Sequence, residues 1–270
     1  RKKDKINLPD KNKDLKKYLS IKYSYPAWIV NKFISQYGIS RTEEILKAGN
    51  KRGQVIYRHN SLKMDREKFL DLLKKEEVEF EQSFLDSFYK IKKFANPSQT
   101  EAFKKGGAYI QGTSAGLASL LLAPQKGMSV LDLAAAPGGK TTHLAELMSN
   151  TGKIKALDIN QSRLNLIEEN IERLGVKNVK LIKADAAEHQ DSEKYDRILA
   201  DLPCSGLGLF ASKPEIKWSK SPEIIEKMAD LQYQILNNNL DKLKVGGNLL
   251  YSTCTLTKEE NQNLIDRIIS

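Results

Sequence analysis

Short apolar runs alternate with helical patterns from residue 129 to the end of the chain. The runs cover residues 130–133, 153–157, 179–182, 197–200 and 248–252. The helix expected after the second run begins at the capping residue Asn160, passes through Leu174 and stops at Gly175. This succession of strands and helices predicts an α/β fold, with a parallel sheet covered on both faces.

Further helix and turn signals follow the fourth run. Ser221 and Pro222 predict the start of a long helix that reaches about Leu243. Gly246-Gly247 predicts a turn before the last strand, and Thr257-x-x-Glu260 predicts a capping box that opens a final helix.

The part of the chain before the strand–helix pattern divides into a linker and a small mixed region. Residues 1–20 are Lys-rich and are expected to be a basic linker. Within residues 21–108, one helix is expected from Pro26 to about Gly38 and another up to Gly49. Strands are expected at 55–57, 88–91 and 108–110, with a helix over 65–75. Residues 109–270 then form the α/β domain.

The basic charge lies entirely in the first part of the chain. Residues 1–108 hold 25 Lys and Arg against 14 Asp and Glu, whereas residues 109–270 hold 19 against 20. Such an asymmetry suggests an anionic partner, most simply nucleic acid, and is equally compatible with a solvated Lys-rich surface. No apolar run approaches the ~20 residues of a membrane span, so an integral membrane protein is not expected.

Acids and cysteines follow the predicted strands. Asp158, Asp185 and Asp201 end three of them, and Cys204 and Cys254 come shortly after two. Ligands of parallel sheets bind beyond the carboxyl ends of the strands, so these residues are expected to gather at the ligand edge. With two cysteines and three histidines, the sequence has no zinc-ligand spacing and no disulfide framework, which predicts a reduced, metal-independent, cytoplasmic protein.

The turn after the first strand has two interpretations. Ala134-Ala135-Ala136-Pro137-Gly138-Gly139-Lys140-Thr141 ends like a P-loop, but Ala134 replaces its first Gly and Pro137 lacks an amide proton. Alternatively, it is a nucleoside-binding turn, because Asp158 follows at the spacing of an acid that binds ribose hydroxyls. S-adenosylmethionine fits the second interpretation, with its ribose at Asp158 and its carboxylate at the start of the helix.

The two cysteines indicate the chemistry. A lone Cys is more often a small buried hydrophobe, but here both cysteines map to the ligand edge. A thiolate is a strong nucleophile when its pKa is lowered. Methylation of C5 of a pyrimidine needs such a nucleophile, because C5 reacts poorly until a group has added at C6.

Together these motifs resemble those of the RNA cytosine-5 methyltransferases of the Sun/Fmu (RsmB) and NOL1/NOP2 family, most closely the bacterial 16S rRNA methyltransferase B members. The resemblance spans about residues 25–270 and is strongest at Asp132-x-Ala134 to Thr141, Asp201-x-Pro203-Cys204-Ser205 and Thr253-Cys254. Pro214-Glu215-Ile216-Lys217-Trp218 also looks like a family signature. One departure is Ala134, where many members carry Cys.

The resemblance implies a Rossmann-like S-adenosylmethionine-dependent methyltransferase domain preceded by a helical and α+β RNA-binding region. It implies that Cys254 attacks C6 of the cytosine, that Asp201 binds the cytosine edge, and that Cys204 assists proton loss and release. The target base would have to leave any stack to reach the thiol. The residues implied to line the cofactor are Ala134, Ala135, Ala136, Pro137, Gly138, Gly139, Lys140, Asp158, Asp185 and Asp201. Lys217 and Trp218 are candidates for RNA contact, although Trp218 is equally compatible with a core position.

The resemblance also suggests a substrate and a domain organisation. Small-subunit ribosomal RNA is the expected substrate of a monomeric enzyme, with tRNA left open. Sun-type relatives carry an amino-terminal NusB-like helical domain and further carboxy-terminal strands. A chain that starts at Arg1 without Met and stops at Ser270 fits a piece that lacks both.

Other functions stay open on the sequence alone. A P-loop nucleotide hydrolase and a non-catalytic RNA-binding or assembly factor are the alternatives. A rival assignment makes Cys204 the nucleophile, because its Pro-Cys setting resembles that of the DNA cytosine methyltransferases.

Overall fold

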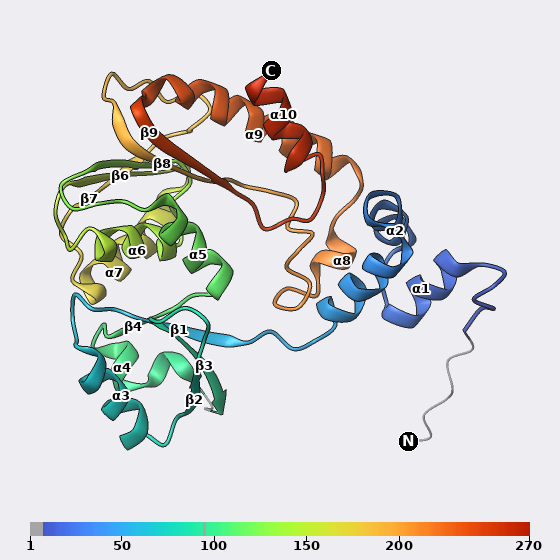
Figure 1. Cartoon of the computed structure of the whole chain (residues 1–270), viewed down its shortest axis with the longest axis horizontal. Coiled ribbons are helices and arrows are strands. Elements are labelled where there is room, and N and C mark those ends of the chain that lie inside the picture. Colours follow the sequence, from blue (N-terminus) through green and yellow to red (C-terminus); the bar gives the residue numbers. More distant parts are fainter. Residues whose placement is uncertain (1–7, 94–95) are drawn as a thin grey trace. The chain divides into compact units, whose positions relative to one another are not determined.

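The computed structural model describes residues 8–93 and 96–270, which form two compact units (Figure 1). The helical unit comprises residues 8–53, 203–233 and 253–270, and the sheet unit comprises residues 54–202 and 234–252. Both units are discontinuous in sequence, because the chain leaves the sheet unit after residue 202 and again after residue 252. The predicted contiguous division at residues 108 and 109 stays a prediction.

The sheet unit is built on five parallel strands. Their order is β7-β6-β5-β8-β9, and every neighbouring pair is parallel. The order reverses between β5 and β8, which are adjacent, and helices α5, α6 and α7 lie along one face (Figure 1). This arrangement confirms the α/β, Rossmann-like fold. The strands are β5 (Ser129–Asp132), β6 (Lys153–Asp158), β7 (Val179–Lys183), β8 (Tyr195–Asp201) and β9 (Leu243–Ser252); the helices are α5 (Thr113–Leu122), α6 (Gly139–Leu147) and α7 (Gln161–Leu174).

Local signals fix the ends of α7 as predicted. The side chain of Asn160 accepts hydrogen bonds from the amides of Ser162 and Arg163, and Gly175 adopts a left-handed conformation at the carboxyl end. The buried face of α7, which includes Leu164 and Ile167, packs on Ala156 of β6. Burial of such side chains, at about 25 cal/mol per Å² of apolar surface, holds the helix on the sheet.

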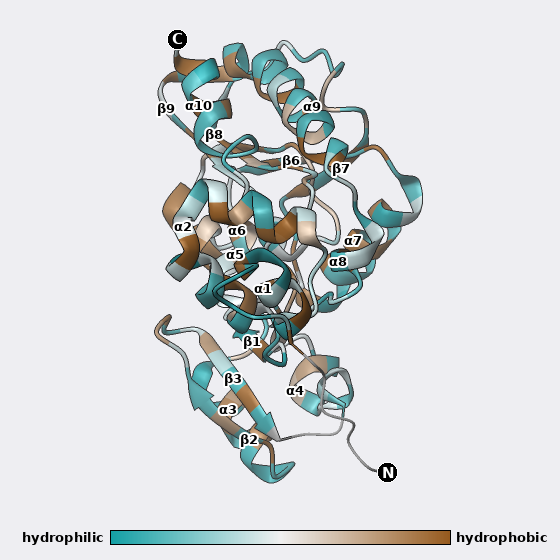
Figure 2. Ribbon diagram, turned by 90° about the vertical axis from the view of Figure 1, so that its right-hand side faces the viewer, coloured by the Kyte–Doolittle hydropathy of each residue, from teal (hydrophilic) through white to brown (hydrophobic). Residues whose placement is uncertain are grey.

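The sheet unit also contains a smaller antiparallel sheet. Its order is β2-β3-β1-β4, and it packs with α3 and α4 around Tyr57, Phe69 and Tyr89. Hydrophobic and hydrophilic residues are interspersed along β3 (Figure 2), and Tyr89 and Ile91, two residues apart, contribute to this core. The elements are β1 (Val55–His59), α3 (Arg66–Lys75), β2 (Glu79–Gln82), β3 (Phe88–Lys93), the short 3-10 turn η1 (Pro97–Gln99), α4 (Glu101–Lys104) and β4 (Ala108–Ile110).

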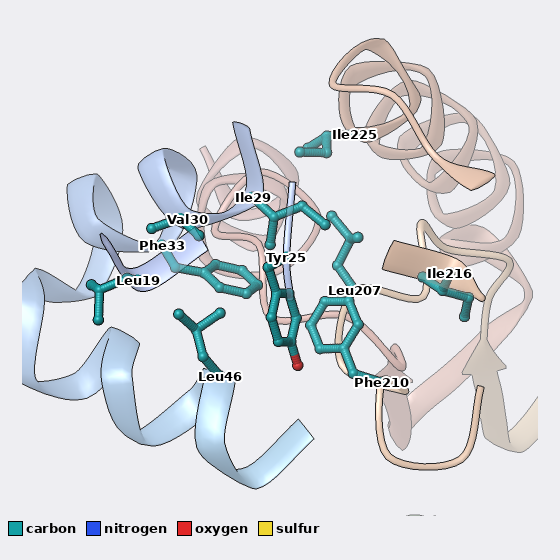
Figure 3. Packing of buried hydrophobic residues seen from close by; sticks show 10 residues of the cluster. All are labelled: Leu19, Tyr25, Ile29, Val30, Phe33, Leu46, Leu207, Phe210, Ile216 and Ile225. Carbon is teal, nitrogen blue, oxygen red and sulfur yellow. The ribbon is translucent and has the colours of Figure 1, made fainter. Parts of the chain in front are cut away.

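The helical unit has its own apolar core, formed by segments far apart in sequence. Tyr25 and Phe210 meet edge to face with ring centroids 5.1 Å apart, and Phe33 packs beside them (Figure 3). The unit includes α1 (Leu15–Tyr23), α2 (Ala27–Gly49), α8 (Ile216–Ser219), the first part of α9 (Glu223–Asn239) and α10 (Gln262–Ile269). Residues 234–239 of α9, with the 3-10 turn η2 (Leu240–Lys242), belong to the sheet unit.

The predicted break between two helices near Gly38 is present as a kink. Gly38 has φ 75° and ψ 172°, which interrupts α2 within its 27–49 span. A residue with a Cβ disfavours this positive φ, so glycine suits the position. The two predicted helices are therefore present, joined at Gly38.

Two predictions near the carboxyl end are wrong, one of a turn and one of a helix start. Gly246 and Gly247 lie within β9, where the pairing with β8 shifts register, so they form an irregularity in a strand rather than a turn before it. The last helix begins at Gln262, not after Thr257, because the side chain of Thr257 donates to the carboxylate of Glu260 instead of capping a helix. Helix α5 and strand β2 were not among the predicted elements.

Candidate active site

The carboxyl ends of β5 and β8 bring a lysine and an acid together. Lys140, in the first turn of α6, places its Nζ 2.5 Å from Asp201 Oδ2. The other oxygen of Asp201 accepts a 2.7 Å hydrogen bond from Ser252 Oγ at the end of β9. These strands flank the point where the strand order reverses, which is where parallel sheets bind ligands.

Three backbone amides of the turn between β5 and α6 donate to acceptors within the sheet unit. The amide of Ala135 donates to Leu157 O at 2.8 Å, that of Ala136 to Asp158 Oδ2 at 3.3 Å, and that of Gly138 to Ala135 O at 2.7 Å. A phosphate cradle needs such amides free. Lys140 is likewise paired with Asp201, so the geometry fits a P-loop poorly.

Gly138 is required by the shape of this turn. Its φ is +95°, and a Cβ would lie 2.9 Å from Ile167 Cγ2 of α7. The turn therefore approaches α7 closely, with Ala135 and Ala136 providing small side chains on the way. Small residues at such a turn allow a ligand to approach the backbone closely.

The two remaining strand-end acids contact the loops that follow them. Asp158 is 4% exposed, accepts a 3.0 Å bond from the Asn160 amide, and lies 3.7 Å from Arg163 Nη1. The half-buried Asp185 accepts a 2.9 Å bond from the Ala187 amide. Both acids lie at the predicted edge of the sheet. Asp158 also accepts the hydrogen bond from the Ala136 amide of the turn.

Asp132 was quoted in the sequence motif but was not predicted as a site residue. It ends β5, is 1% exposed, and accepts a 2.7 Å bond from Thr141 Oγ1. The pKa of Asp132 is raised to about 7. Burial is the largest cause, the hydrogen bond from Thr141 opposes it, and the charge of Asp201 adds to it. A carboxyl that titrates near neutral pH therefore lies beside the turn.

Sequence reasoning also missed Arg58, which has no local signal. Arg58 lies on β1 of the small sheet, is fully buried, and donates from Nη1 to Gly139 O at 2.6 Å and to Gln111 Oε1 at 2.5 Å. Its Nη2 bonds Thr142 Oγ1 at 3.1 Å, and its Nε lies 3.2 Å from Glu146 Oε2. The small sheet thus supports the first turn of α6.

The helical unit brings the two cysteines together. Their Sγ atoms lie 2.7 Å apart, and the Cys254 amide donates to Cys204 Sγ at 3.2 Å. Cys204 is half-buried, whereas Cys254 is exposed. The hydrogen bond with the Cys254 side chain, and then burial, raise the pKa of Cys204 well above its usual range.

Comparison with known proteins shows which family has these motifs. A family model described as "16S rRNA methyltransferase RsmB/F" matches residues 119–270, more than half of the chain. The chain belongs to this family. A second model, described as "Methyltr_RsmF/B-like, ferredoxin-like domain", matches residues 25–88, which include part of the small sheet of the sheet unit. RsmB/F proteins use S-adenosylmethionine, as the resemblance implied.

Relatives agree with this assignment. The chain is 36% identical to the "Probable ribosomal RNA small subunit methyltransferase B" of Bacillus subtilis, over 93% of the chain and 57% of that protein. It is 43% identical to the "tRNA (cytosine(72)-C(5))-methyltransferase" of Pyrococcus horikoshii, over 66% of the chain and 46% of that protein. The crystal structure of NSun6 from Pyrococcus horikoshii with SFG superposes with a TM-score of 0.85 at 27% identity, covering 92% of this chain and 88% of that one. The chain spans less than two thirds of the curated relatives it matches.

The two candidates for RNA contact in segment 214–218 differ in burial. Lys217 is buried, donates to Asn50 Oδ1, and places its Nζ 3.9 Å from the centre of the Tyr25 ring. Trp218 is 64% exposed. Of the two candidates for RNA contact, only Trp218 is therefore accessible, while Lys217 acts in the core of the helical unit.

Residues 8–93 and 96–270 contain neither a metal-binding cluster nor a membrane-spanning helix. No group of three or more His, Cys, Asp or Glu side chains there is arranged to hold a metal ion. No helix in the same part of the chain has the length and apolarity to cross a membrane.

Proposed function

We propose that this chain transfers a methyl group from S-adenosylmethionine to C5 of a cytosine in RNA. The observation that carries the proposal is the thiol pair of Cys204 and Cys254, 2.7 Å apart. β8 and β9 pair in parallel up to Asp201 and Ser252, and each cysteine follows its strand within two or three residues.

Cys254 acts as the nucleophile in the proposed reaction. Its thiolate adds to C6 of the cytosine, which forms an S–C6 bond and makes C5 electron-rich. Asp201 hydrogen-bonds the cytosine edge and supports protonation at N3, with Lys140 and Ser252 holding its carboxylate. S-adenosylmethionine, when bound, supplies the methyl group that C5 receives.

Cys204 acts in release. Once the methyl group is on C5, the Cys204 thiol loses its proton to solvent and its thiolate takes the C5 proton. The electron pair of that C–H bond restores the ring double bond while the S–C6 bond breaks, which returns Cys254 as a thiolate, and N3 then gives up its proton. The largest cause of the raised pKa of Cys204 is its hydrogen bond to Cys254. That bond is lost when Cys254 Sγ is bonded to C6, so the pKa of Cys204 falls at the step that needs its thiolate.

The residues at the sheet edge fit S-adenosylmethionine better than a nucleoside triphosphate. The amides of Ala135, Ala136 and Gly138 are engaged within the protein, and Asp158 stands where an acid binds the ribose in sheets of this kind, with Asp185 beyond the next strand. A triphosphate would instead need free amides and a free lysine. Residues 134–140 with Asp158, Asp185 and Asp201 therefore form the proposed cofactor site.

The proposal extends to the RNA substrate, the cellular location and the oligomeric state. A basic excess of +11 in residues 1–108 suits a polyanion, and small-subunit ribosomal RNA is the substrate named for the Bacillus subtilis relative. The relative from Pyrococcus horikoshii acts on tRNA, so tRNA is the competing substrate. We place the protein in the cytoplasm as a monomer.

The deciding experiment incubates the chain with S-adenosylmethionine and unmodified transcripts of 16S ribosomal RNA fragments or of tRNA. Mass spectrometry of the nucleosides should detect 5-methylcytidine in the ribosomal RNA. Methylation of tRNA alone would correct the substrate. RNA binding with no methylation would favour a non-catalytic factor, and Mg²⁺-dependent ATP binding with no binding of S-adenosylmethionine would overturn the proposal.

A further inference from the structure

A buried carboxylate lies behind the two cysteines of the helical unit. Glu260 has no exposed surface and accepts hydrogen bonds from several donors. The Ser205 amide donates to Oε1 at 2.8 Å, and Ser205 Oγ donates to Oε2 at 2.5 Å. Thr257 Oγ1 donates to Oε2 at 2.8 Å, and Gln232 Nε2 donates to Oε1 at 3.1 Å.

The donors come from the segments that carry the thiols. Ser205 directly follows Cys204, and its hydroxyl also bonds Thr255 Oγ1 at 2.8 Å, the residue directly after Cys254. A single carboxylate with its donors therefore joins the two cysteine segments on their buried side. Because buried polar networks are rigid when satisfied, this one fixes the spacing of the two segments.

Gln232 extends the network to the other side of Cys204. It is fully buried on α9, and the nitrogen that bonds Glu260 also donates to Pro203 O at 2.8 Å. The residues on both sides of Cys204 are thereby held by Gln232 and Glu260.

We propose that Glu260 is a positioning residue that holds the Sγ atoms of Cys204 and Cys254 within proton-exchange distance. The inference rests on the proposed function for its catalytic meaning, but the geometry it asserts is independent of methylation. Glu260 touches no reacting atom in this scheme. It acts through Ser205 and Thr257.

The replacement Glu260→Gln separates charge from shape. The side chain keeps its size but loses its charge, and its amide nitrogen can only donate. The hydroxyls of Ser205 and Thr257 would therefore have to turn from donors into acceptors, and their charge-assisted hydrogen bonds would be lost. Glu259→Gln is the matched control, because Glu259 bonds Lys32 and Gln36 of α2 and none of the network residues named above. Thr257→Val is a milder variant that removes one donor.

The rate at which the two thiols join measures their spacing without reference to RNA. The oxidant diamide takes two hydrogens and is reduced to its hydrazine, while the thiols become one disulfide. The chain has no other cysteine, so the loss of free thiols reports this pair alone. We expect Glu260→Gln to slow the reaction by about tenfold, as loss of proximity implies, and Glu259→Gln to leave it unchanged.

Thermal unfolding shows whether each variant is folded. If Glu260→Gln does not fold, the rate of disulfide formation in Thr257→Val tests the inference in its place. Slower disulfide formation in a folded variant, together with a lower rate of single-turnover methyl transfer, supports the inference. Disulfide formation at the wild-type rate in folded Glu260→Gln, or in Thr257→Val where that variant decides, overturns it. If the wild-type chain joins its thiols rapidly but methylates no RNA, the proposed function fails and the positioning role stands.

Discussion

Arg58 donates a 2.6 Å hydrogen bond to the carbonyl oxygen of Gly139, the first residue of α6. The small antiparallel sheet thus reaches the turn proposed to bind S-adenosylmethionine through one buried guanidinium. The same group bonds Thr142 and Gln111, so it fixes the entry of α6 from several directions. The part that matches the ferredoxin-like model therefore supports the shape of the turn in the proposed cofactor site.

The first prediction follows from this contact. Arg58→Lys keeps the charge but loses the fork of donors, so the turn loses support and the affinity for S-adenosylmethionine falls. The expected change in Kd is about tenfold, the size of one charge-assisted hydrogen bond. Calorimetric titration measures it. Arg41→Lys, at an exposed pair with Glu44, is the control. An unchanged Kd for Arg58→Lys would show that the turn keeps its shape without the fork.

The second prediction concerns the dependence of stability on pH. Burial raises the pKa of Asp132 from 3.8 to about 7, so the folded chain holds this proton more tightly than the unfolded chain. The resulting stabilisation is full at low pH and is lost as pH rises from about 4 to about 7. Asp132→Asn removes this loss and still accepts from Thr141, so the variant should gain stability relative to wild type as pH rises.

Thermal unfolding at about pH 5 and about pH 7.5 tests this, as the difference between the two proteins. Taking the difference removes contributions that both proteins share. One of them comes from His143: burial lowers its pKa, so its contribution to stability is lost as pH falls, opposite to that of Asp132. A difference that stays constant with pH would mean that Asp132 is already ionised throughout.

The third prediction concerns the basic first part of the chain. Residues 1–13 hold six Lys and Arg and two Asp, a net charge of +4, and α1 keeps its N-cap Asp14 when they are removed. If these charges contact phosphates, RNA affinity falls and the slope of log K against log salt flattens by up to about 3. Filter binding at several salt concentrations measures it, with a variant carrying Gln in place of the six basic residues as the control for length. An unchanged slope would mean that the segment is solvated.

Local signals predicted much of the fold, because they act within a few residues. Asn160 and Gly175 bound α7 through contacts that lie in the sequence itself, and the break at Gly38 needs only its positive φ. Arg58 and Glu260 could not be found in this way. Their partners lie 81 and 55 residues away, and neither residue type signals such a partner. The capping box at Thr257 failed because Glu260 bonds Ser205 instead, a competition that only the tertiary structure decides.

The last prediction distinguishes the roles of the two cysteines. If Cys254 forms the bond to C6 and Cys204 helps to break it, Cys254→Ala binds RNA and cofactor but forms no adduct. Cys204→Ala methylates once and then stays bound, which gives a protein–RNA species that survives denaturing electrophoresis. The exposed thiol of Cys254 and the raised pKa of Cys204 favour this order. The double variant should show no band and serves as the control. A trapped band only in Cys254→Ala would reverse the roles, since the remaining thiol of Cys204 would then be the one that holds the RNA.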